Sequence, residues 1–60
     1  MIFAKQIRVV DKNGSVKVHI YVTQLYTIGN HVVIVSEEDK NSYTTDRYTV
    51  AELDRMEVQF

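Results

Sequence analysis

The sequence predicts an all-β domain of five antiparallel strands that spans residues 1–60. Ten valines, five isoleucines, five threonines, four tyrosines and two phenylalanines favour a pleated, half-buried surface. Leucine and alanine, which favour helices, occur only twice each. The length of 60 residues allows one domain at most, and a domain this small buries only ~60% of the surface that its unfolded chain exposes.

The first two strands are predicted to pair as a hairpin, because apolar residues alternate along residues 2–10 and 15–22. The Asn-Gly pair between them is a strong signal for a type I′ turn, in which both central residues have positive φ. A two-residue or four-residue loop sets the apolar side chains on one face, whereas a three-residue loop sets Ile7 against His19. We therefore expect the two-residue register. Its pairs are Val9 with Val18, Ile7 with Ile20, and Lys5 with Val22.

The alternation slips beyond this hairpin, which predicts a bulge near Thr23-Gln24. Gly29-Asn30 supplies a second turn before a third strand over residues 31–36. The Val32–Val35 run is apolar on both faces. Such a strand either lies in the middle of a sheet or exposes one apolar face to a partner.

A charged turn over residues 37–42 precedes a fourth strand, which we expect at a sheet edge because it carries Asp46 and Arg47. The spacing of Thr49 and Glu52 fits a capping box and predicts one turn of α- or 3₁₀-helix over residues 49–55. A last short strand is expected over residues 57–60.

The order of four strands, one helical turn and a last short strand is similar to that of the small SH3-like barrels. The resemblance covers most of the chain as element order, without the acidic and aromatic ligand-groove pattern of true SH3 domains and without Sm or KOW signatures. It implies a small five-stranded β-barrel with a 3₁₀ turn before the last strand. The alternative fold is a curled antiparallel sheet whose edges are completed by a second copy.

Composition narrows the possible functions. Seven basic and eight acidic residues give a net charge of −1, so the chain lacks the basic excess of proteins that bind nucleic acid through phosphate contacts. No apolar run reaches the ~18–20 residues of a membrane span. Lys5 and Arg8 interrupt any signal-peptide core, so we expect a cytoplasmic protein without membrane contact. Self-association is one way to stabilise so small a core, and a homo-oligomer stays open.

No catalytic, cofactor or metal site is predicted, and we expect no enzyme. The chain has no cysteine for nucleophilic catalysis or thiolate ligation. Its serines lie near predicted turns, with no histidine and acid arranged beside them. His19 and His31 are interpreted as ordinary strand-surface residues, because a metal site would need the fold to bring both together with a carboxylate and the expected register sets His19 opposite Arg8, which repels a cation.

The predicted binding surface is the face of the first hairpin opposite its valines. The candidate partner-binding residues are Arg8, Lys17, His19, Tyr21 and Tyr26. Basic and aromatic side chains on a firm β surface suit protein interfaces and also single-stranded nucleic acid, although they can simply be solvated. We expect a non-catalytic accessory or regulatory protein, of the kind that phages and mobile elements encode, which binds another protein. The alternatives are a single-stranded nucleic-acid-binding β-barrel and a structural homo-oligomer joined through Val32–Val35.

Overall fold

The structure, a computed structural model, describes residues 2–60 and consists of one antiparallel sheet with the strand order β4-β3-β2-β1-β5. The prediction of an all-β protein with five antiparallel strands is confirmed. The described residues contain no helix, and therefore none that is long and apolar enough to cross a membrane. The strands are β1 (Ala4–Asp11), β2 (Val16–Ile28), β3 (His31–Asp39), β4 (Ser42–Thr49) and β5 (Leu53–Gln59).

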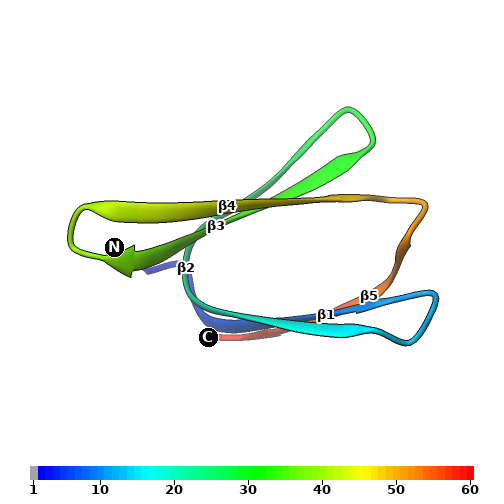
Figure 1. Cartoon of the computed structure of the whole chain (residues 1–60), viewed down its shortest axis with the longest axis horizontal. Helices are drawn as coiled ribbons and strands as arrows, with labels where there is room; N and C mark the ends of the chain where they lie inside the picture. Colours follow the sequence, from blue (N-terminus) through cyan, green and yellow to red (C-terminus); the bar gives the residue numbers. More distant parts are fainter. Residues whose placement is uncertain (1) are drawn as a thin grey trace.

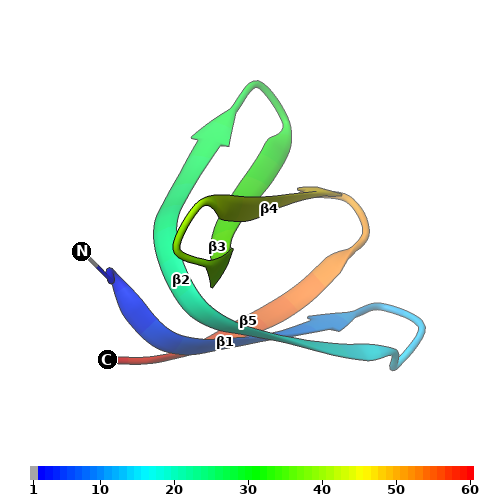
Figure 2. The same cartoon turned by 60° about the vertical axis from the view of Figure 1, so that its left-hand side comes forward.

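The sheet curls into two layers, which Figure 1 shows one above the other. β1, β5 and the first half of β2 form one layer, and the second half of β2 forms the other with β3 and β4. β2 belongs to both layers because it bends midway (Figure 2). β4 and β5 stand at the two ends of the strand order and do not pair, so residues 2–60 form no closed barrel. The predicted edge position of the fourth strand is confirmed.

The bend in β2 lies between Tyr21 and Gln24. Tyr21 has a φ of 54°, the only positive value among the described residues other than glycine. The register with β3 shifts between Val22 and Gln24, so the predicted bulge near Thr23-Gln24 is confirmed. The Thr23 hydroxyl donates to the carbonyl oxygen of Val35 at 3.2 Å and ties the bulge to β3.

The register of the first hairpin differs from the prediction. Ile7 lies opposite His19, and Val18 lies opposite Arg8. The expected pairs of Val9 with Val18, Ile7 with Ile20 and Lys5 with Val22 are therefore wrong. The shift by one residue moves every side chain of the first half of β2 to the other face of the sheet.

The turn explains this register. Only Gly14 has a positive φ in it, at 86°, so the turn is not of type I′. Asp11 N–H donates to the Ser15 carbonyl oxygen at 3.0 Å, which closes a three-residue loop. The Asp11 carboxylate also accepts the N–H groups of Asn13 and Ser15, each at 2.9 Å. These local bonds outweigh the alternation of apolar residues along the strand.

The predicted helical turn over residues 49–55 does not form, and residues 50–52 make a short turn between β4 and β5. Both bonds of the capping box are nevertheless present. Thr49 N–H donates to Glu52 Oε1 at 2.8 Å, and Glu52 N–H donates to Thr49 Oγ1 at 3.3 Å. β5 begins directly afterwards at Leu53 instead of at residue 57, because pairing with β1 satisfies its backbone better than one isolated helical turn.

The hydrophobic core lies between the two layers. Its fully buried members are Ala4, Ile7, Val9, Val22 and Ile34, and the half-buried side chains of Leu25, Tyr48, Leu53, Met56 and Val58 pack against them. β3 is central in its layer, and its residues 32–34 are all buried. β3 therefore does not expose the apolar face on which the expected Val32–Val35 contact between copies depended.

Candidate functional site

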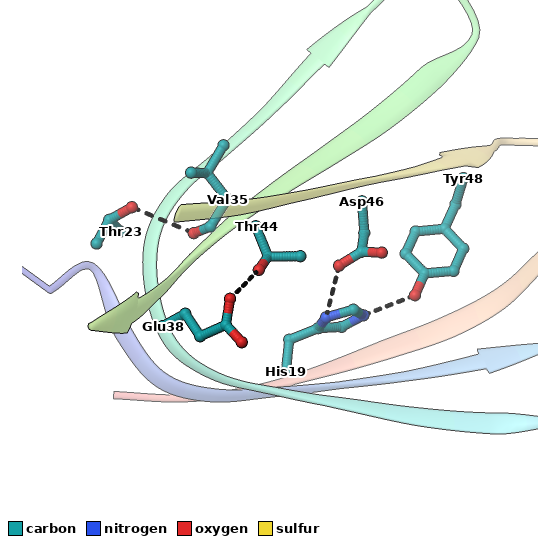
Figure 3. A network of polar contacts seen from close by, with 7 residues as sticks. All are labelled: His19, Thr23, Val35, Glu38, Thr44, Asp46 and Tyr48. Atoms are coloured by element: carbon teal, nitrogen blue, oxygen red, sulfur yellow. Dashed lines mark hydrogen bonds and ion pairs between the residues drawn. The ribbon is translucent and has the colours of Figure 1, made fainter. Parts of the chain in front are cut away.

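A histidine bridge joins the two layers where no backbone ladder does. His19, in the first half of β2, points across the space between the layers toward two residues of β4 (Figure 3). Its Nε2 lies 2.6 Å from the Tyr48 hydroxyl, and its Nδ1 lies 3.4 Å from Asp46 Oδ2. A neutral ring protonated on Nδ1 fits this geometry, since Nε2 then accepts from the hydroxyl while Nδ1–H faces the carboxylate.

Burial changes the acidity of the bridge. Only 10% of the His19 side chain is exposed. Burial lowers the pKa of His19, as does Lys17 to a smaller extent, and the negative charge of Asp46 opposes them. Burial raises the pKa of Tyr48, with Asp46 and Glu52 acting in the same direction. The structure thus favours the neutral form of both rings.

The bridge resembles an acid–histidine–hydroxyl triad in its connectivity but is poorly suited to catalysis. A nucleophilic hydroxyl needs help to lose its proton, whereas the surroundings of Tyr48 hold its proton more tightly. Both nitrogens of His19 face protein groups. Within residues 2–60, no group of three or more histidine and acidic residues could hold a metal ion. The arrangement instead suits a structural role, in which polar contacts of His19 with Tyr48 and Asp46 join the two layers.

The bridge divides an opening between residues 15–21, at the start of β2, and residues 44–48 of β4, which we name the β2–β4 slit. A hollow of about 270 Å³ lies on one side and is lined by charged side chains of both signs, among them Asp11, Lys17, Arg47 and Glu52. A second hollow of about 280 Å³ lies on the other side. It runs beside Val18 and Ile20 and is lined by Glu37, Glu38 and Asp46.

The structure does not bring the predicted site residues together. Lys17 and His19 face the inside of the slit, whereas Arg8 lies on the opposite face, where its guanidinium is 3.6 Å from Glu57. Tyr21 is exposed beside the second hollow. Tyr26 is exposed on the second half of β2, in the other layer. The expected joint outward face of Arg8, Lys17, His19 and Tyr21 is wrong, because it depended on the wrong hairpin register.

The sequence analysis missed an outward row of apolar side chains. Val16, Val18 and Ile20 were expected inside, yet they are 53%, 51% and 53% exposed. A signal in the sequence could have revealed them. Asp11-Lys12-Asn13-Gly14 places aspartate first and glycine fourth, which is typical of a type I turn followed by a glycine bulge and hence of a three-residue loop.

The main-chain N–H and C=O groups of these three residues, Val16, Val18 and Ile20, are also unpaired. Asp11 and Ser15 direct N–H and C=O groups at one another across the hairpin. Because an antiparallel ladder alternates, Lys17 and His19 also direct theirs toward β1, and the residues between them direct theirs away. β3 meets β2 only from Val22 onward. Residues 2–60 therefore offer no ladder partner to Val16, Val18 and Ile20, which we name the free β2 edge.

No family model matches the chain, and no curated protein or solved structure is detectably similar to it. Its class is therefore defined by the structure alone, as a curled five-stranded antiparallel sheet with an unpaired segment in its long second strand.

Proposed function

We propose that the protein is a non-catalytic binding module that recognises another protein by adding a strand to the free β2 edge. The observation that carries this proposal is the coincidence of two features at Val16, Val18 and Ile20. Their side chains are about half exposed, and their main-chain groups have no ladder partner. An extended segment of a partner can bond to such an edge while its own apolar side chains cover the row.

The free β2 edge also lacks the features that usually protect a sheet edge. Edge strands tend to carry charged residues or proline, which discourage pairing with other chains. β4 carries Asp46 and Arg47, and β5 carries Arg55 and Glu57. The outward row of the free β2 edge is entirely apolar and β-branched, so this segment suits strand addition better than either terminal strand of the sheet.

Single-stranded nucleic acid is a weaker candidate. A basic and aromatic patch was the basis of that alternative, but Arg8 and Lys17 lie on opposite faces of the hairpin. The two acidic residues Glu37 and Glu38 line the hollow next to the free β2 edge, and they would repel phosphate. The likeness to SH3-like barrels stays a prediction, because residues 2–60 form neither a closed barrel nor a 3₁₀ turn. The proposed strand addition does not depend on it.

A capture experiment tests the proposal. The immobilised chain is exposed to lysate of its source cell, with and without nuclease, and compared with the variants Val18→Lys and Val50→Lys. Val50 is the matched control, since it is the same residue type, 55% exposed, and lies in the turn after β4. Nuclease-resistant capture that Val18→Lys abolishes and Val50→Lys preserves supports the proposal. Capture that is unaffected by Val18→Lys, or lost with nuclease, contradicts it.

A further inference from the structure

We infer that a second copy of this chain occupies the free β2 edge, so that two molecules pair antiparallel about a two-fold axis at Val18. This inference rests on the proposed strand addition and names its partner. The paired layers would then form a continuous six-stranded sheet in the order β5-β1-β2-β2-β1-β5.

The backbone of the edge is complementary to itself. About an axis through Val18, Val16 lies opposite Ile20 of the second copy, and Val18 lies opposite Val18. These are the three residues whose N–H and C=O groups point away from β1. Each opposed pair can therefore exchange two hydrogen bonds, as hydrogen-bonded pairs in an antiparallel ladder do. An axis at Lys17 or His19 would set only two of these three residues against each other, and it would therefore form two hydrogen-bonded pairs instead of three.

The outward side chains fit the same axis. The pairing sets Val16 beside Ile20 of the second copy and joins two exposed apolar rows into one patch. Cross-strand pairs of β-branched residues are favourable in sheets, and each partner removes apolar surface of the other from water. A chain of 60 residues gains more from such burial than a large domain, because it buries less surface by itself.

Charge on the inward side also favours a second copy. Lys17 of the second copy lies opposite His19, at the mouth of the hollow lined by Glu37, Glu38 and Asp46. Its ammonium group would then lie on the side of the sheet that carries these three carboxylates, and the two-fold axis repeats this arrangement. Since the net charge of each chain is −1, little long-range repulsion opposes association.

Sedimentation velocity from micromolar to millimolar concentration gives the first test. We expect a dimer whose dissociation constant rises roughly tenfold or more in Val18→Pro. Proline at this position removes only an outward N–H group, so the fold is expected to survive. Lys17→Pro is the contrasting variant, because it removes a bond to β1 and is expected to disturb the fold. A monomer at every concentration contradicts the inference.

A cross-linking test avoids proline substitutions and their possible effect on the fold. The chain has no cysteine, so a single Val18→Cys substitution gives one defined thiol. Opposed residues of a hydrogen-bonded pair have Cα atoms ~5.5 Å apart, within the range of a disulfide. We expect Val18→Cys to form a disulfide-linked dimer under mild oxidation, and Val50→Cys, which is equally exposed, to do so far more slowly. Equal rates contradict the inference.

The two proposals fail differently. A monomeric chain that still captures a protein in a manner sensitive to Val18→Lys retains strand addition as its function and excludes the second copy as partner. A dimer that survives both Val18→Pro and Val18→Lys has another interface and contradicts the pairing. A monomer without capture contradicts both proposals.

Discussion

His19 Nε2 and the Tyr48 hydroxyl lie 2.6 Å apart, although their strands share no backbone pairing. The rings also meet edge to face, with centroids 5.7 Å apart. A closed barrel would join its terminal strands through a ladder of main-chain bonds. In this protein, side chains span the slit between β2 and β4 instead, which leaves the β2 backbone available to other chains.

Removal of the bridge should destabilise the fold. His19→Ala deletes a nearly buried ring and leaves two polar groups of β4 without their partner, so we expect a loss of about 2 kcal/mol in the free energy of unfolding. Urea denaturation measures it. His31→Ala serves as the control, since His31 forms no side-chain bond in the described chain, and a loss within about 0.5 kcal/mol is expected there. Equal losses would show that the bridge contributes nothing specific.

Stability should fall as the solution becomes mildly acidic. Burial lowers the pKa of His19 in the folded state, so the unfolded chain binds a proton first as the pH decreases. The contribution of neutral His19 is therefore complete above about pH 6.5 and is lost progressively below it. The measurement is the free energy of unfolding at about pH 7.5 and about pH 5.5. His19→Asn should reduce the difference, and an unchanged difference in that variant would contradict the assignment to His19.

Tyr21 should be replaceable by glycine more readily than by alanine. Its φ of 54° is a conformation that disfavours any residue with a Cβ atom. Tyr21→Gly relieves this strain and Tyr21→Ala does not, so we expect the glycine variant to be more stable by about 1 kcal/mol. Thermal denaturation of the two variants gives the comparison. The opposite order would show that Tyr21 stays at positive φ without measurable cost.

Asn13 and Gly14 of the first turn should respond differently to alanine. Gly14 has a φ of 86°, and Gly14→Ala is expected to cost about 1 kcal/mol even though nothing lies within 4 Å of an added Cβ. Asn13 has no positive φ, so Asn13→Ala should stay within about 0.5 kcal/mol of the wild type. A type I′ turn would make both substitutions costly, so chemical denaturation distinguishes the two registers.

The capping box should behave as a unit. Thr49 and Glu52 exchange bonds between side chain and main chain across the turn from β4 to β5. We expect Glu52→Ala to cost about 1 kcal/mol, because it removes the acceptor of the Thr49 N–H. Thr49→Ala should cost less, because the Glu52 N–H keeps the Thr49 carbonyl oxygen as an acceptor at 3.2 Å. The double variant should cost less than the two losses together. Strict additivity in urea denaturation would show that the two bonds are independent.

Much of the fold follows from the sequence, because composition and turn residues act locally. The β-branched content, the bulge near Thr23 and the edge position of the fourth strand depend on short-range rules. The hairpin register did not follow, since two local rules compete there. Alternation favours an even loop, while the carboxylate of Asp11 and the positive φ of Gly14 favour three residues. Our prediction gave more weight to the alternation of apolar residues, whereas in the structure the turn residues determine the register.

The candidate site was mispredicted for the same reason and for one more. The register error exchanged the two faces of the first half of β2, so Lys17 and His19 were expected outside and Val18 inside. The bridge to Asp46 and Tyr48 also depends on the curl of the sheet. These residues are 27 and 29 positions from His19 and meet it only when both layers are in place. No local pattern in the sequence encodes that meeting.

The bend at Tyr21 makes the 13 residues of β2 an edge strand of both layers. If β2 detaches, each layer loses one of its three strands. The stability of one layer therefore depends on that of the other, because both contain part of the same continuous strand. We therefore expect the amide protons of β4 and β5 to lose protection at the same denaturant concentration. If a partner pairs with the free β2 edge as proposed, its binding should therefore stabilise both layers of the sheet.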